Sequence, residues 1–184
     1  MSVHCVAEAD PTATLVLAAR TGEAGALDRL YRRFAPVVHG VLLGYVQKAD
    51  ADDLTQEVFA HALPRLHELR EPAAFPGWIL SIARRAALDA RRRRAPLTGI
   101  DVDAVDSRAS HEDRLDAQRS LAAIRGLPQA YRETLMLRLV EGLTGPEIAQ
   151  RTGLSAGSVR VNLHRGMALL RAALANGRTG VGPR

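Results

Sequence analysis

Apolar residues recur at intervals of three and four along much of the chain. From Leu15 to Tyr45 this spacing predicts an amphipathic helix, because positions three and four apart share one helix face. Pro36 lies within the stretch and predicts a bend, since proline has no backbone N–H to donate. The apolar positions that define this face are Leu27, Leu30, Tyr31, Phe34, Val37, Val38, Val41, Leu42 and Tyr45.

A second apolar stripe predicts another helix, and it consists of Leu54, Val58, Ala62, Leu66 and Leu69. Pro64 falls inside this stripe, so a kink or a break is expected there. The segment 67–77 then contains two prolines and a glycine, which is typical of a loop. We expect a third helix to begin near Phe75.

This third helix has an apolar face and a basic face. The apolar positions are Ile79, Ile82, Ala83, Ala86 and Ala90, and the opposite face carries Arg84, Arg85, Leu88, Arg91 and Arg92. Trp78 lies at the flank of the apolar stripe, and its size favours packing in the core.

The periodic pattern disappears between Ala95 and Asp116, where six acidic residues accompany two arginines. Such a stretch has too little apolar surface to offset the entropy lost on ordering, which is typical of a solvated linker. The sequence therefore predicts an all-α protein with two small helical domains, 12–94 and 116–176, joined by a flexible acidic linker, 95–115.

The second domain opens with a helix after the break at 126–128, and its residues Leu135, Leu139 and Val140 are expected to face inward. A short capped helix follows. Thr144 and Glu147 have the spacing of a capping box, with Pro146 tolerated in the first turn.

Two further signals mark the end of the short helix and the start of the last one. Gly153 suits the left-handed residue of a sharp turn, and Ser155 is a good N-cap. Short helix, turn and longer helix together predict a helix-turn-helix.

On the last helix, steps of about 100° per residue separate a buried face from an exposed one. The inward positions are Val159, Leu163, Gly166, Met167, Leu170 and Leu174, whereas Val161, His164, Arg165, Ala168 and Ala172 point away. The start of the exposed face is expected to enter a DNA major groove, where arginine can pair with guanine. A solvated helix with ordinary surface arginines is the simpler alternative.

Composition narrows the possible partners and cofactors. The formal net charge is +5, supplied mostly by arginine, which favours nucleic acid as a partner. The single cysteine, Cys5, and six histidines without ligand spacing predict no disulfide, no metal site and no cofactor. No long apolar run or cleavable leader is evident, so we expect a cytoplasmic protein without direct membrane insertion.

Two long motifs resemble those of one bacterial family. The segment from Leu127 to Arg171, "LPQAYRETLMLRLVEGLTGPEIAQRTGLSAGSVRVNLHRGMALLR", is similar to the C-terminal domain of RNA polymerase sigma factors of the extracytoplasmic function (ECF) group. The segments "DDLTQEVFAHALPRL" and "FPGWILSIARRAALDARRRR" resemble their N-terminal domain, in the same order and at the same separation.

This resemblance implies a sigma factor that binds core RNA polymerase and promoter DNA and performs no catalysis. It assigns duplex minus-thirty-five binding to the last helix and minus-ten binding to the arginine-rich helix, with the loop from His67 to Phe75 holding a captured base. An anti-sigma protein is a further expected partner. Arg85 stands where the family often has asparagine, and Val161 and Asn162 stand where relatives commonly carry Ser and Arg.

The resemblance gives three groups of expected contact residues. The acidic exposed face of the second helix is assigned to the polymerase clamp, although acids also suit a helix N-terminus. The residues expected to contact the minus-thirty-five element are Ser155, Ser158, Arg160, Val161, Asn162, His164 and Arg165. Those expected to contact the minus-ten element are Phe75, Arg84, Arg85, Asp89, Arg91 and Arg92. Those expected to contact polymerase are Asp53, Leu54, Gln56, Glu57 and Ala60.

Two alternatives have different signatures. A conventional helix-turn-helix regulator would bind duplex operator DNA without polymerase, usually as a dimer, and no dimerisation helix follows Leu174 in the pattern. An enzyme would need paired carboxylates, a nucleophile with a base, a phosphate-binding loop or a metal cluster, and the sequence contains none of these patterns.

Overall fold

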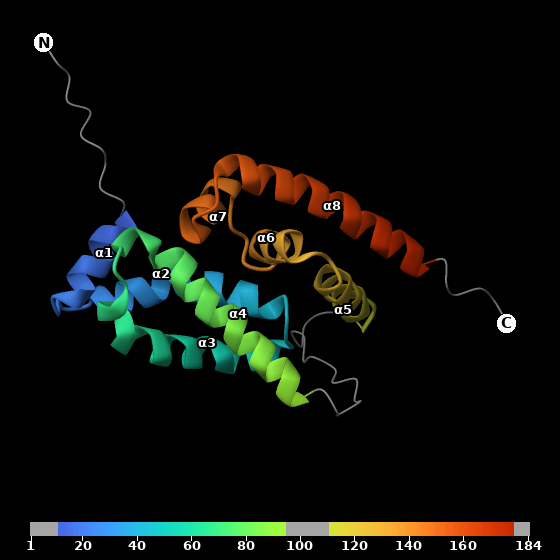
Figure 1. The fold of residues 1–184 in the computed structure, drawn as a ribbon. Helices are drawn as coiled ribbons and strands as arrows, with labels where there is room; N and C mark the ends of the chain where they lie inside the picture. The colour runs from blue at the N-terminus through green and yellow to red at the C-terminus, as the bar shows by residue number, and fades with distance from the viewer. Residues whose placement is uncertain (1–10, 95–110, 179–184) are drawn as a thin grey trace, which may run out of the picture.

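The structure is a computed structural model that describes residues 11–94 and 111–178, and within them every regular element is a helix (Figure 1). The N-terminal half contains α1 Pro11–Arg20, α2 Ala26–Leu43, α3 Lys48–Ala62, the 3₁₀ helices η1 Leu63–Glu68 and η2 Pro72–Ala74, and α4 Phe75–Arg94. The C-terminal half contains α5 His111–Arg125, α6 Gln129–Leu139, α7 Gly145–Thr152 and α8 Ala156–Arg178. The all-α prediction is confirmed. Most of the expected linker lies outside the described residues, and α5 begins at His111, within the range assigned to it.

The predicted helix from Leu15 to Tyr45 is in fact two helices. Gly22 and Gly25 lie between α1 and α2 with φ angles of 77° and 74°, which L-residues with a side chain rarely adopt. The chain turns at these glycines, so the expectation of one helix was wrong. Pro36 lies inside α2, which continues through it to Leu43.

Pro64 has the predicted effect on the second helix. α3 ends at Ala62, and the chain continues as the tighter 3₁₀ helix η1, in which Pro64 occupies the first turn. α4 begins at Phe75, as predicted. The ring of Phe75 packs edge-on against Phe34 of α2 with centroids 4.9 Å apart, in the centre of the N-terminal core.

The helix-turn-helix forms from the expected local signals. Thr144 accepts a hydrogen bond from the amide of Glu147, whose carboxylate accepts one from the Thr144 amide at 2.9 Å. Gly153 ends α7 with a φ of 76°, and the Ser158 amide donates to Ser155 Oγ at 3.1 Å at the start of α8. These caps satisfy backbone groups that helix ends leave without partners.

The inward faces of the C-terminal helices were predicted with mixed success. Val159 and Leu170 of α8 are buried as expected, and so is Leu135 of α6. However, Leu139 and Val140 are 49% and 44% exposed, so their inward assignment was wrong. Met136 and Leu137 are buried instead, because α6 packs against both α8 and the N-terminal half.

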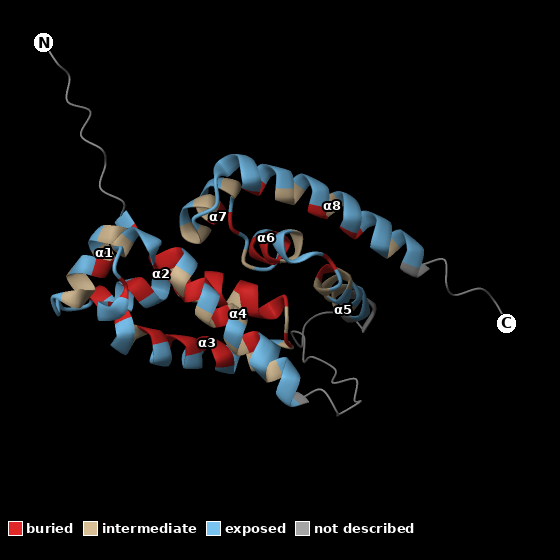
Figure 2. Cartoon of the chain, viewed as in Figure 1, coloured by how far each residue is buried: buried red, intermediate tan, exposed pale blue. Residues whose placement is uncertain are grey.

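The two helical units are docked against each other, with α6 between α8 and the N-terminal helices (Figures 1 and 2). α2 meets α6 where Gly40 leaves room for Leu137: a Cβ on Gly40 would lie 2.9 Å from Leu137 Cδ2. Buried residues of both halves form one continuous cluster. Both predicted helical units are present, and the second unit covers part of the first.

Candidate nucleic-acid and polymerase surfaces

The exposed start of α8 has the form expected of a DNA-reading surface. Arg160, Val161, His164 and Arg165 line one shallow hollow of about 410 Å³, and all four residues are exposed. Two guanidinium groups therefore flank an imidazole and an apolar side chain. This combination can donate to guanine edges and phosphates and can contact a thymine methyl.

Three other residues predicted for this surface lie outside the hollow. Ser155 and Ser158 are exposed, and their hydroxyl oxygens lie 2.9 Å apart at the helix N-terminus. Asn162 is only half-buried and turns toward α6, where its side-chain amide lies 3.5 Å from Thr134 Oγ1. Asn162 thus lies at the edge of the exposed face, with its amide directed into a pocket between the halves.

The basic face of α4 is only partly open. Arg85, Asp89, Arg91 and Arg92 are exposed, and Arg92 lies 3.5 Å from Asp89. Phe75 is fully buried, because α4 begins with its first side chain in the core. Its assignment to the minus-ten contacts therefore needs correction, since the ring is not accessible to DNA in this arrangement. Trp78 is half-buried and packs against the core, which confirms the structural assignment.

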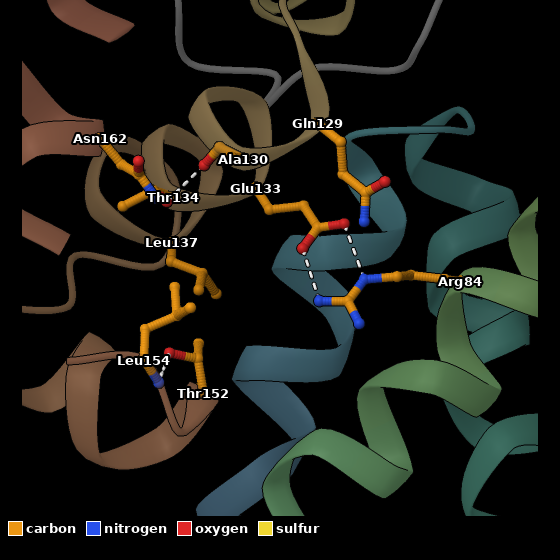
Figure 3. A pocket seen from close by; sticks show the side chains of 9 residues that line it. All are labelled: Arg84, Gln129, Ala130, Glu133, Thr134, Leu137, Thr152, Leu154 and Asn162. Carbon is orange, nitrogen blue, oxygen red and sulfur yellow. Dashed lines mark hydrogen bonds and ion pairs between the residues drawn. The ribbon is translucent and has the colours of Figure 1, made fainter. Parts of the chain in front are cut away.

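Arg84 is held by the other half of the molecule. Its Nε lies 2.9 Å from Glu133 Oε1 and its Nη2 lies 2.8 Å from Oε2, a bidentate pair (Figure 3). Tyr45 also donates to Glu133 Oε1, at 2.8 Å. The hydrogen bond to Glu133 raises the pKa of Arg84, although burial opposes it, so the guanidinium stays charged.

Figure 3 also shows the pocket of about 350 Å³ that surrounds this ion pair. Its walls come from α4, α6, the end of α7, the turn before α8 and α8 itself, and they include Leu137, Leu154 and Asn162. Nothing in the local sequence pattern identified Glu133, because it lies 49 residues from Arg84 and is one acid of an ordinary-looking helix.

The acidic face of α3 is exposed at most of the predicted positions. Asp53, Gln56, Glu57 and Ala60 are all accessible, whereas Leu54 is 5% exposed and faces the core. Leu54 therefore reaches the surface only in the wall of the groove between α3 and α4, and its assignment to polymerase binding stays a prediction. Period-four spacing places Leu54 with Val58 on the buried side of the helix.

A groove of about 340 Å³ runs between α3 and α4 and brings two predicted surfaces together. Glu57, assigned to polymerase, lines it together with Arg85 and Asp89, assigned to DNA. The helices contact along much of their length, so acidic and basic residues border one strip of surface. Within residues 11–94 and 111–178, no cluster of His, Cys, Asp or Glu is arranged to hold a metal ion, and no helix is apolar and long enough to cross a bilayer.

Family models match both halves of the chain. Residues 30–96 match sigma-70 region 2, and residues 118–170 match sigma-70 region 4. The chain is also 34% identical over 182 residues to the ECF RNA polymerase sigma factor SigE of Mycolicibacterium smegmatis, covering 90% of this chain and 69% of SigE. The chain belongs to the ECF sigma factors.

Solved structures share the fold of this sigma factor. CnrH in complex with the cytosolic domain of CnrY aligns over 90% of this chain and 97% of the matched chain, with a TM-score of 0.58 and 23% identity. The sigma factor RpoE of Bartonella quintana, in complex with the anti-sigma factor NepR, covers 83% of this chain and 98% of its own, with a TM-score of 0.53 and 18% identity. Membership in the family favours an initiation factor and does not support the conventional helix-turn-helix regulator.

Proposed function

We propose that this sigma factor binds core RNA polymerase through the exposed acidic face of α3 and directs it to a specific set of promoters. The exposed start of α8 reads the minus-thirty-five duplex, and the basic face of α4 binds the minus-ten element as the strands separate. The observation that carries this proposal is the match to both sigma regions in one chain, with Arg160 to Arg165 accessible on α8.

The chemistry of the surfaces supports this division of labour. Asp53 and Glu57 give α3 a charge that repels DNA and suits a basic partner surface. Arg85, Arg91 and Arg92 on α4 suit phosphates of an opened strand, where contact is mainly electrostatic. The factor itself needs no catalytic group, because the polymerase performs the chemistry.

One further partner and a location follow from this role. An anti-sigma protein is a proposed regulator, since RpoE, a structural neighbour, was solved with the anti-sigma factor NepR. Because core polymerase and promoters are cytoplasmic in bacteria, the proposed place of action is the cytoplasm.

The test is transcription by purified core polymerase and this chain on a promoter library, without a housekeeping sigma factor. We expect transcripts from a defined subset of promoters, and none when Asp53 and Glu57 are both replaced by Lys. If about five phosphates are neutralised, log affinity for promoter DNA should fall with log salt at a slope of about −4.5. Binding to duplex DNA without any association with core polymerase would contradict the proposal.

A further inference from the structure

His39 of α2 lies between two carboxylates, one from each half of the molecule. Its Nδ1 lies 2.7 Å from Glu141 Oε1, which follows α6 in the C-terminal half. Its Nε2 lies 3.0 Å from Asp52 Oδ1 of α3, within ion-pair distance although not aligned as a hydrogen bond. The His39 and Glu141 side chains are 20% and 14% exposed, so water screens this contact only partly.

This geometry favours the imidazolium over neutral imidazole. A neutral ring carries one N–H, so a ring that donates to Glu141 would present a lone pair to Asp52. The protonated ring donates an N–H to Glu141 and places its positive charge beside Asp52. The hydrogen bond to Glu141 raises the pKa of His39 above its ordinary value, helped by the charges of Glu141 and Asp52, while burial and Lys48 of α3 oppose the shift.

We propose that His39 is a proton-dependent latch, which holds the C-terminal half against the N-terminal half when protonated and releases it when neutral. The contact joins residues 102 positions apart, and Glu141 belongs to the same covering segment as Leu137, which packs over Gly40. When the latch forms, it therefore holds α6 against α2 along their shared interface.

The latch also controls the accessibility of Arg84. Glu133 lies on α6, the helix that His39 helps to hold, and its two carboxylate oxygens occupy the edge of the Arg84 guanidinium formed by Nε and Nη2 (Figure 3). An arginine paired in this way cannot form the same bidentate contact with a phosphate. On the proposed function, which assigns Arg84 to the minus-ten element, the closed arrangement is thus self-inhibiting.

The direction of the pH effect follows from the sign of the shift. The closed state binds the proton on His39 more tightly than the open state, so closure is favoured fully below the ordinary pKa of histidine. The contribution of His39 to the stability of the closed state is lost as the pH rises through the raised pKa of its imidazole. Alkaline conditions should therefore open the molecule.

The distance between the halves in the full-length chain tests this inference directly. We would replace Cys5 by Ser and place spin labels at Ser81→Cys on α4 and Ala172→Cys on α8, both exposed positions. Between about pH 6 and about pH 8.5, where histidine titrates, the open population should rise roughly three- to tenfold. His39→Gln should abolish this response.

His61→Gln is the matched control, because His61 is an exposed histidine of α3 that contacts Arg65 within its own half. This variant should keep the full pH response. Should His39→Gln fail to fold by circular dichroism, Glu141→Gln leaves the ring in place and should move the response to lower pH. A distance that is independent of pH in the parent chain, or a response that persists in His39→Gln, overturns the proposal.

This experiment needs neither polymerase nor promoter. A failed latch leaves the transcription test of the proposed function unaffected. Conversely, a chain that opens as the pH rises but supports no transcription would support the latch and contradict the proposed function.

Discussion

Helices α8 and α4 both carry arginines predicted to bind DNA, but the two surfaces differ in how they are positioned. On α8, Arg160 and Arg165 are exposed, and the helix is set by caps and a turn within a few residues of them. On α4, Arg85 is exposed while the neighbouring Arg84 is paired with Glu133 of the other half. The accessibility of the α8 arginines therefore depends on nearby residues, whereas that of Arg84 on α4 depends on how the halves are docked.

This difference shows that a charged residue on a helix face is not necessarily available for a ligand. Arg84 and Arg85 are adjacent in sequence, yet Arg84 is bonded to Glu133 of the docked α6, whereas Arg85 lines the groove between α3 and α4. A surface controlled by docking can change when the halves separate, whereas the α8 surface should stay the same. Substitutions that separate these two behaviours test the comparison.

The largest effect is expected on α8. Replacing Arg160 and Arg165 together by Ala should weaken binding of the minus-thirty-five duplex by roughly 100-fold, because each lost base or phosphate contact costs about 1–3 kcal/mol. Fluorescence anisotropy with the sigma factor bound to core polymerase measures this affinity. Arg171→Ala, further along the same helix and also exposed, is the control and should change it little. Equal losses in both variants would mean that the interaction is unspecific charge attraction.

A smaller effect should separate Arg84 from Arg85. Arg84→Ala leaves Glu133 largely buried without its cation, so the halves should part, and the open population in spin-label distances should rise roughly tenfold. Arg85→Ala should leave that distance unchanged. Both substitutions should weaken binding of a single-stranded minus-ten oligonucleotide. An unchanged distance in Arg84→Ala would show that the ion pair does not hold the closed arrangement.

The next smaller effect concerns Gly40, where α2 packs closely against the C-terminal half. A Cβ on Gly40 would lie 2.8 Å from Glu141 Cγ and 2.9 Å from Leu137 Cδ2, and Leu137 is buried and cannot easily move. Gly40→Ala should therefore weaken the closed state by about 1–3 kcal/mol, measured as the open fraction. Gly77→Ala is the matched control: it also lies in a helix, has nothing within 4 Å of its Cβ position, and should stabilise α4 by up to about 1 kcal/mol. Similar distances in both variants would contradict the role of Gly40.

The sequence predicted best those features whose signals lie close together. Thr144 and Glu147 are three residues apart, and Gly153 and Ser155 follow within one turn, so the helix-turn-helix could be predicted from spacing alone. The same holds for the break of α3 before Pro64. Family resemblance then supplied the function, which no local pattern contains.

The features that sequence reasoning missed depend on distant contacts. The burial of Phe75 depends on Phe34 from another helix, and the pairing of Arg84 depends on Glu133. Leu139 was placed inward from its apolar character, yet docking of α6 buried Met136 and Leu137 instead. A periodic pattern gives the face of a helix but not the neighbour that covers it.

The smallest effect should come from the capping box of α7, which helps to position the α8 surface through contacts within the C-terminal half. Thr144→Ala removes the side-chain oxygen that accepts from the Glu147 amide, so the free energy of unfolding should fall by about 1 kcal/mol. Urea unfolding measures this loss, and Ser81→Ala is the control, because its hydroxyl bonds only a carbonyl within the same helix.

The loss should also depend on pH in a defined direction. Hydrogen bonds from the Thr144 amide and hydroxyl lower the pKa of Glu147, so the box contributes fully above the ordinary pKa of a glutamate. Its contribution fades as the pH falls through the lowered pKa, and the difference between Thr144→Ala and the parent chain should shrink in acid. The distance between the halves should be unchanged by Thr144→Ala at any pH, since the caps lie within one half. If Thr144→Ala instead opened the molecule, the α8 surface would depend on docking as much as the α4 surface does.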